Sequence, residues 1–125
     1  MDNSDKLKYA RNLLLGLHKN LVDFERSGYE RINGPLSAGQ FLNVLLEDQD
    51  FSWLRKFSML IVEIDEMFAL KDGIPAELID ANLVKVRELV DMSPEDEYFR
   101  AKYRNALDKD ADAAASHARL EALFQ

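Results

Sequence analysis

The residues of this sequence best able to move protons or hold charge stand out by their spacing. The apolar run SMLIVEIDEMF, residues 58–68, carries Asp65 in its middle. On a helix that turns by about 100° per residue, Asp65 falls beside Leu54 and Ile61 and opposite the most charged side of the run. We therefore expect Asp65 to be at least partly buried once this helix packs.

A second set of polar residues recurs on the first predicted helix. Arg11, His18 and Glu25 are each seven residues apart and fall within or beside its leucine face, and Tyr29 lies close to the same line. A buried carboxylate without a partner is costly or changes its protonation state. Arg11 and His18 are therefore the candidate partners of Asp65, and Glu25 is expected to take the other of these two or Arg55.

These observations predict a polar seam between the two helices, and three interpretations of it stay open. The seam is a structural network that fixes helix register, or it lies at the boundary where long side chains reach water. In the third interpretation it lines a pocket in which Arg11 holds an anion and His18 with Asp65 moves a proton. The predicted seam comprises Arg11, His18, Glu25, Tyr29, Ser58 and Asp65.

Catalytic and metal-binding signatures are absent from the sequence. A Ser58, His18 and Asp65 grouping is conceivable, but Ser58 and Asp65 are about 10 Å apart along one helix. The chain has no cysteine, and neither of its two histidines is preceded three residues earlier by Glu or Asp, as a di-iron bundle requires. We expect no metal, no cofactor and no catalytic residue, and we incline against an enzyme.

Aromatic residues gather around the start of the apolar run and on a later helix. They form the core of the fold, or they line a groove for an apolar ligand or partner helix, or a homodimer face. The residues of this predicted aromatic groove are Phe41, Phe51, Trp53, Phe57, Tyr98, Phe99 and Tyr103.

Nearly every segment that carries these residues has the apolar periodicity of a helix, and the few glycines and prolines fall at the breaks. The sequence predicts an all-α, single-domain bundle or orthogonal array of five to six helices, in which the helix of about residues 51–71 is central. We expect the first helix to end at Gly28 or to continue to Ile32. The remaining helices are predicted after Ser37, from Pro75 to about Met92, from the Ser93-Pro94-Glu95-Asp96 start, and from about Ala111.

Length and composition limit the class of protein. The 125 residues suit one domain, which we place at 1–119. The last six residues, LEALFQ, resemble what a viral 3C-type protease leaves after cutting off a tag, so residues 120–125 are expected to be a protease-site remnant. The alternative is a native helix end.

Charge and hydropathy exclude further classes. A formal charge of −7 disfavours nucleic-acid binding, which relies on neutralising phosphates. The longest apolar stretch is far shorter than the roughly 20 residues of a membrane span, and the N-terminus lacks the pattern of a secretory signal. We expect a soluble, cytoplasmic protein that contacts neither membrane nor nucleic acid.

Two hypotheses of function remain. The leading one is a helical domain that acts mainly through protein–protein interaction, as a homodimer or with another protein. The alternative is a small-molecule sensor or enzyme that uses the polar pocket between the first and third helices.

Overall fold

The computed structural model describes residues 1–93 and 95–125, and these residues form α helices and one 3-10 helix without a strand. The all-α, single-domain prediction is confirmed. The elements are α1 (Asn3–Asn33), α2 (Ala38–Glu47), the 3-10 helix η1 (Gln49–Leu54), α3 (Arg55–Phe68), α4 (Ala76–Val90), α5 (Glu97–Lys109) and α6 (Ala111–Leu123).

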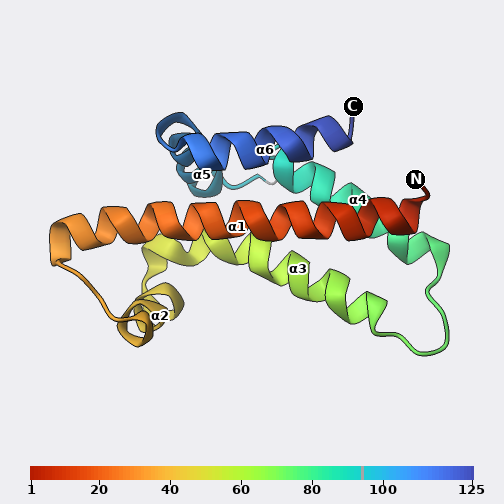
Figure 1. The fold of residues 1–125 in the computed structure, drawn as a ribbon, viewed down its shortest axis with the longest axis horizontal. Coiled ribbons are helices and arrows are strands. Elements are labelled where there is room, and N and C mark those ends of the chain that lie inside the picture. The colour runs from red at the N-terminus through yellow and green to blue at the C-terminus, as the bar shows by residue number, and fades with distance from the viewer. Residues whose placement is uncertain (94) are drawn as a thin grey trace.

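The long helix α1 is the centre of the molecule. It runs the whole length of the fold, with α3 on one side and α5 and α6 on the other (Figure 1), and it packs against α3, α4, α6 and η1. The segment predicted to be central, residues 51–71, also lies in the core, to which it contributes Phe57, Leu60 and Ile64 among others, but it is not one helix. That segment is divided into η1 and α3, because Asp48 caps a tight 3-10 turn by accepting a hydrogen bond from the backbone N–H of Asp50.

The sequence of α1 explains why it stays helical over 31 residues. The side chain of Asp2 caps its start by accepting from the backbone N–H of Asp5. Leu7, Leu14 and Leu21 repeat every seven residues on one face, and all three are fully buried. Of the two predicted ends, the distal one is correct. The helix passes Gly28 and ends where Gly34 adopts a φ of 86°, a conformation that favours glycine.

Two further helix starts depend on capping side chains. The predicted capping box at α2 is present, since Ser37 accepts from the backbone N–H of Gln40 and the Gln40 side chain accepts from that of Ser37. At α5 the cap is Asp96, which accepts from Phe99 N–H. The helix therefore begins later than the Ser93 start predicts, and Pro94 lies outside the described residues.

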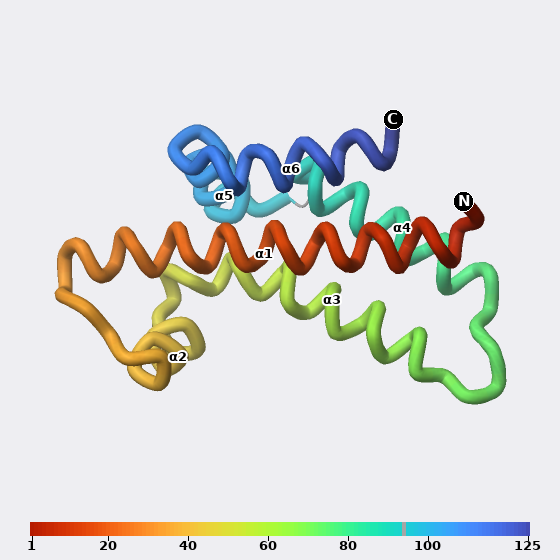
Figure 2. Tube along the Cα trace, viewed as in Figure 1, coloured from red at the N-terminus to blue at the C-terminus, as the bar shows by residue number. Residues whose placement is uncertain are grey.

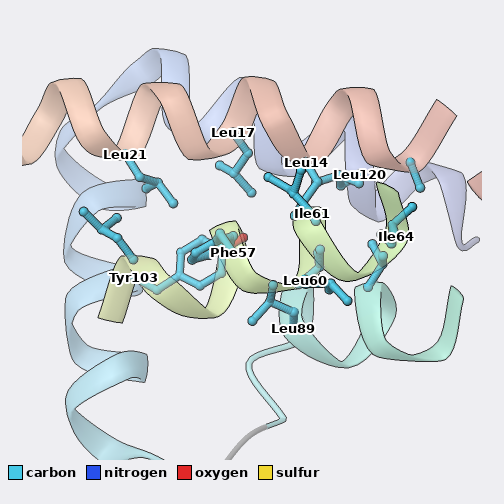
Figure 3. Packing of buried hydrophobic residues seen from close by; sticks show 14 of the residues in the cluster. Leu14, Leu17, Leu21, Phe57, Leu60, Ile61, Ile64, Leu89, Tyr103 and Leu120 are labelled. Carbon is cyan, nitrogen blue, oxygen red and sulfur yellow. The ribbon is translucent and has the colours of Figure 1, made fainter. Parts of the chain in front are cut away.

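The core forms where the leucine face of α1 meets the other helices. Figure 3 shows Leu14, Leu17 and Leu21 pointing toward side chains of α3, and Leu89 of α4 and Leu120 of α6 complete the cluster. Burying a leucine side chain fully contributes about 1.5–3 kcal/mol. Packing along α1 therefore contributes to stability and helps to fix the positions of α3, α4 and α6.

The chain folds back so that its ends lie together. Figure 2 shows both termini at the same end of the molecule, and Lys6 Nζ lies 5.1 Å from the centre of the Phe124 ring. Leu120 is fully buried, although it belongs to the segment predicted to be a protease-site remnant. The origin of residues 120–125 stays a prediction. Within the described residues, no helix is long and apolar enough to cross a membrane.

Candidate functional site

The predicted partner of Asp65 is correct, but its predicted burial is wrong. Arg11 Nε donates to Asp65 Oδ1 at 2.8 Å and Arg11 Nη2 donates to Oδ2 at 2.9 Å, so the guanidinium binds the carboxylate in a bidentate arrangement. The Asp65 side chain nevertheless keeps 49% of its surface exposed. The packed side of α3 is the one that carries Phe57 and Ile64, and Asp65 lies at its edge.

This geometry makes the Arg11–Asp65 pair a surface clamp between α1 and α3. The hydrogen bonds from Arg11 lower the pKa of Asp65, and the same contact raises the pKa of Arg11. Exposed ion pairs contribute about 0–1 kcal/mol, since water and salt screen them. Both groups already satisfy each other, so neither presents a free charge to the shallow groove of about 340 Å³ beside them.

Glu25 is the buried charge of the seam, and its partner was not predicted. Lys102 of α5 lies 3.1 Å from Glu25 Oε2, and only 7% of the Glu25 side chain is exposed. The expected partners Arg11, His18 and Arg55 are wrong, because the Glu25 end of α1 meets α5 rather than α3. Lys102 follows Phe99 by three residues and directly precedes Tyr103, so it lies beside the apolar stripe of its helix. That position was the signal in the sequence that Lys102 could reach a buried carboxylate.

The six predicted seam residues do not share one pocket. Arg11 and Glu25 are 14 residues apart, or about 21 Å along α1. His18 lies half-buried between them, where burial lowers its pKa, and the described residues give it no hydrogen-bond partner. Ser58 Oγ donates to the carbonyl of Arg55 at 3.3 Å and lines a different surface. The six residues therefore do not line one pocket, although Arg11 and Asp65 line the groove between α1 and α3, and the small-molecule alternative stays a prediction.

Tyr29 and Glu25 do come together, at the far end of α1. Both line a groove of about 600 Å³ between α1, η1 and α5, where the Tyr29 ring lies 5.9 Å from that of Phe51. The carboxylate of Glu25 is already paired with Lys102 in this groove. Within the described residues, no group of three or more His, Cys, Asp or Glu side chains converges as metal ligands would.

Most of the predicted aromatic groove is core. The rings of Trp53, Phe57, Phe99 and Tyr103 contact one another with centroids 5.2–6.4 Å apart, and none is more than 2% exposed. The groove interpretation is therefore wrong for these four residues, and the core interpretation is correct. They hold η1, α3 and α5 together.

The other three aromatics are also committed to contacts within the chain. Phe41 and Phe51 are buried and lie edge to face at 6.3 Å. Tyr98 is 43% exposed, and its hydroxyl donates to the carbonyl of Asp50 at 2.9 Å. Of the seven, Phe51 also lines the groove beside Tyr29, but the seven together do not form one open aromatic groove.

A hydrogen-bonded chain between α5 and α6 was missed by the sequence analysis. The Tyr103 hydroxyl lies 2.7 Å from His117 Nδ1, and His117 Nε2 lies 3.1 Å from Glu121 Oε1. Burial raises the pKa of Tyr103 and lowers the pKa of His117. Because Tyr103 is fully buried, its hydroxyl is out of reach of a substrate, and the chain fastens α5 to α6.

An open surface lies over α3 and the adjoining side of α4. It is a shallow groove of about 690 Å³ whose floor is apolar. Met59 is 69% exposed and Val62 is 53% exposed at its centre. We call this surface the α3/α4 groove; its lining residues are Lys56, Ser58, Met59, Leu60, Val62, Glu63, Glu66, Lys85, Glu88 and Leu89.

This side of α3 is the most charged side of the helix, which the sequence places opposite Asp65. The charges are present, and Lys85 pairs with Glu63 across the groove. The signal for the apolar centre was the position of Met59 and Val62, which fall among these charges on the helical wheel. Apolar residues inside a charged rim are the usual anatomy of a protein interface.

Comparison with known proteins assigns no function, so the geometry described above is the basis for a proposal. No protein-family model, curated protein or solved structure matches the chain.

Proposed function

We propose that the protein acts through protein–protein contact and that the α3/α4 groove is its contact surface. The observation that carries this proposal is the exposure of Met59 and Val62 over an apolar floor formed by Leu60 and Leu89. Single exposed apolar residues are common on protein surfaces and need no explanation. Here two exposed apolar side chains share one groove over two buried leucines, an arrangement in which apolar residues at the centre of a charged rim resemble a protein interface.

The shape and chemistry of the groove favour a helix as the contacting element. Two neighbouring helices form its sides, and an amphipathic helix can lay its apolar face along such a depression. Met59 is suited to the centre of this contact, because its flexible thioether adapts to the surface that covers it. Covering the surface that Met59 and Val62 still expose would contribute about 1–2 kcal/mol each. The charges at the rim then select the orientation of the partner.

Site-specific photo-cross-linking tests this proposal. The photoreactive amino acid p-benzoylphenylalanine replaces Met59 in one variant and Tyr9 in a control, and the cells that produce each variant are irradiated. Tyr9 is 47% exposed on α1, away from the groove, so the control has comparable access. We expect a discrete protein adduct from position 59 and none from position 9. Absence of an adduct at position 59, or equal adducts at both positions, would contradict the proposal.

A further inference from the structure

Building on the proposed function, we infer that the partner in the α3/α4 groove is a second copy of this chain. In this arrangement the α3 helices of the two copies pack antiparallel, and a two-fold axis passes between Met59 and Val62. The inference depends on the sequence of the outward face of α3 and on the exposure of its residues.

Four residues form a stripe along that outward face. Arg55, Met59, Val62 and Glu66 are spaced by four, three and four residues, which places them on one side of a helix. All four are exposed, and the stripe extends over about 16 Å of helix. The buried residues of α3 lie on the opposite side. The stripe therefore faces outward and is available to a partner.

The order of these four residues is complementary to itself. A two-fold axis between Met59 and Val62 brings Arg55 of one copy opposite Glu66 of the other, and Met59 opposite Val62. Each contact then occurs twice, as the symmetry of an isologous dimer requires. The apolar pairs lie at the centre and the opposite charges lie at both ends. A foreign helix would have to reproduce this order, which α3 itself already provides.

The charges of the stripe remain available for contacts between copies. Glu66 has no ion-pair partner among the described residues, whereas the neighbouring Glu63 is paired with Lys85. Arg55 donates to the carbonyl of Leu46 through one Nη2 nitrogen, which leaves its other donors free for a carboxylate. Opposite charges at both ends favour the antiparallel orientation and oppose the parallel one, in which like charges would meet.

The size and charge of the chain set limits on this dimer. A standard interface covers about 800 Å² on each partner, about a tenth of the 7620 Å² surface of this chain. The contact therefore has to extend from α3 across the rim of α4, where Leu89 and Glu88 lie. Two copies of charge −7 repel each other at long range, so apolar burial must supply the net attraction.

Charge reversal combined with sedimentation equilibrium tests the inference. Purified wild-type protein is expected to be in a concentration-dependent equilibrium between one and two copies. Arg55→Glu and Glu66→Arg each place like charges opposite each other twice, and each should raise the dimer dissociation constant by about tenfold or more. The double variant restores opposite charges, and its dissociation constant should return to within about threefold of the wild-type value.

Lys19 and Asp23 provide matched controls. Both are exposed on α1, four residues apart, and Lys19→Glu and Asp23→Arg change the net charge by the same amounts. We expect neither to alter the dissociation constant more than about twofold. Arg55→Glu also removes the bond to Leu46, so its fold is checked by thermal unfolding. Glu66→Arg removes no such bond, so the test can be decided from this variant even if Arg55→Glu does not fold.

The outcomes separate this inference from the proposed function. A restored dimer in the double variant supports the antiparallel arrangement, and failure of restoration overturns it. If the wild-type chain stays monomeric at hundreds of micromolar while position 59 cross-links to a protein of different mass, the second copy is wrong and the proposed function stands. A monomer without any adduct at position 59 overturns both.

Discussion

Replacing Phe57 by alanine should lower the free energy of unfolding by about 4 kcal/mol, because large-to-small changes in a core lose both burial and packing. Phe57 is fully buried, and its ring lies 5.2 Å from that of Tyr103 and 5.8 Å from that of Phe99. A loss of this size is a large part of the 5–15 kcal/mol typical of a domain. Denaturation by urea, followed by circular dichroism, measures it.

Tyr98→Ala is the matched control for Phe57→Ala. Tyr98 is 43% exposed and makes one hydrogen bond, to the carbonyl of Asp50, so we expect a loss of about 1 kcal/mol. Equal losses at both positions would contradict the assignment of Phe57 to the core. That result would also favour the earlier interpretation, in which the four aromatic residues line a groove that can open.

Replacing Lys102 by alanine should cost about 2–3 kcal/mol, because it leaves the carboxylate of Glu25 buried without its partner. The two side chains meet at 3.1 Å, and only 7% of Glu25 is exposed, whereas 28% of Lys102 is. Replacing both residues together, Glu25→Leu with Lys102→Met, removes the charges and keeps most of the volume. We expect the stability of this double variant to lie within about 1 kcal/mol of the wild type.

Asp65→Ala serves as the comparison for Lys102→Ala, measured by the same urea denaturation. It breaks an ion pair whose members are 28% and 49% exposed, so its expected cost is under about 1 kcal/mol. Added salt should reduce that cost further, while it leaves most of the loss at Lys102 unchanged. Equal costs for Asp65→Ala and Lys102→Ala would contradict the distinction between a surface clamp and a buried pair.

The helices were predictable because their signals are local. The seven-residue repeat of Leu7, Leu14 and Leu21 defines the packed face of α1, and Ser37 with Gln40 defines the start of α2. Such features depend on neighbours along the chain, so the sequence displays them directly. The central role of α1 was less visible, because both α1 and α3 have apolar faces and their sequences do not state which helix the others surround.

The arrangement of charges was predictable only in part. Periodicity placed Asp65 on the side of α3 near Arg11, and that pair forms. It could not show that α3 packs mainly through the side carrying Phe57, which leaves Asp65 at the edge. The pairing of Glu25 with Lys102 depends on how α5 returns to α1, after a separation of 77 residues along the chain. A helical wheel holds no information about such a contact.

The candidate contact surface shows the same limit. Met59 and Val62 lie among charged residues on one side of α3, so the sequence alone shows only a charged side of this helix. The position of α4 turns that side into a groove, because Leu89 adds to its floor and Lys85 and Glu88 add to its rim. A contact surface made by two helices becomes visible only when their packing is known.

Oxidative footprinting of Met59 tests most directly whether the α3/α4 groove is covered by protein. Met59 and Met1 are 69% and 83% exposed in the isolated chain, while Met67 is buried, so the molecule carries its own controls. Peroxide converts accessible methionine to the sulfoxide, and mass spectrometry of peptides gives the rate at each position. The rates are compared between dilute purified protein and the cells that produce it. We expect Met59 to oxidise nearly as fast as Met1 in the dilute protein and severalfold more slowly than Met1 in the cell. Equal rates for Met59 and Met1 under both conditions would contradict it, because the groove would then stay open to solvent where a partner is present.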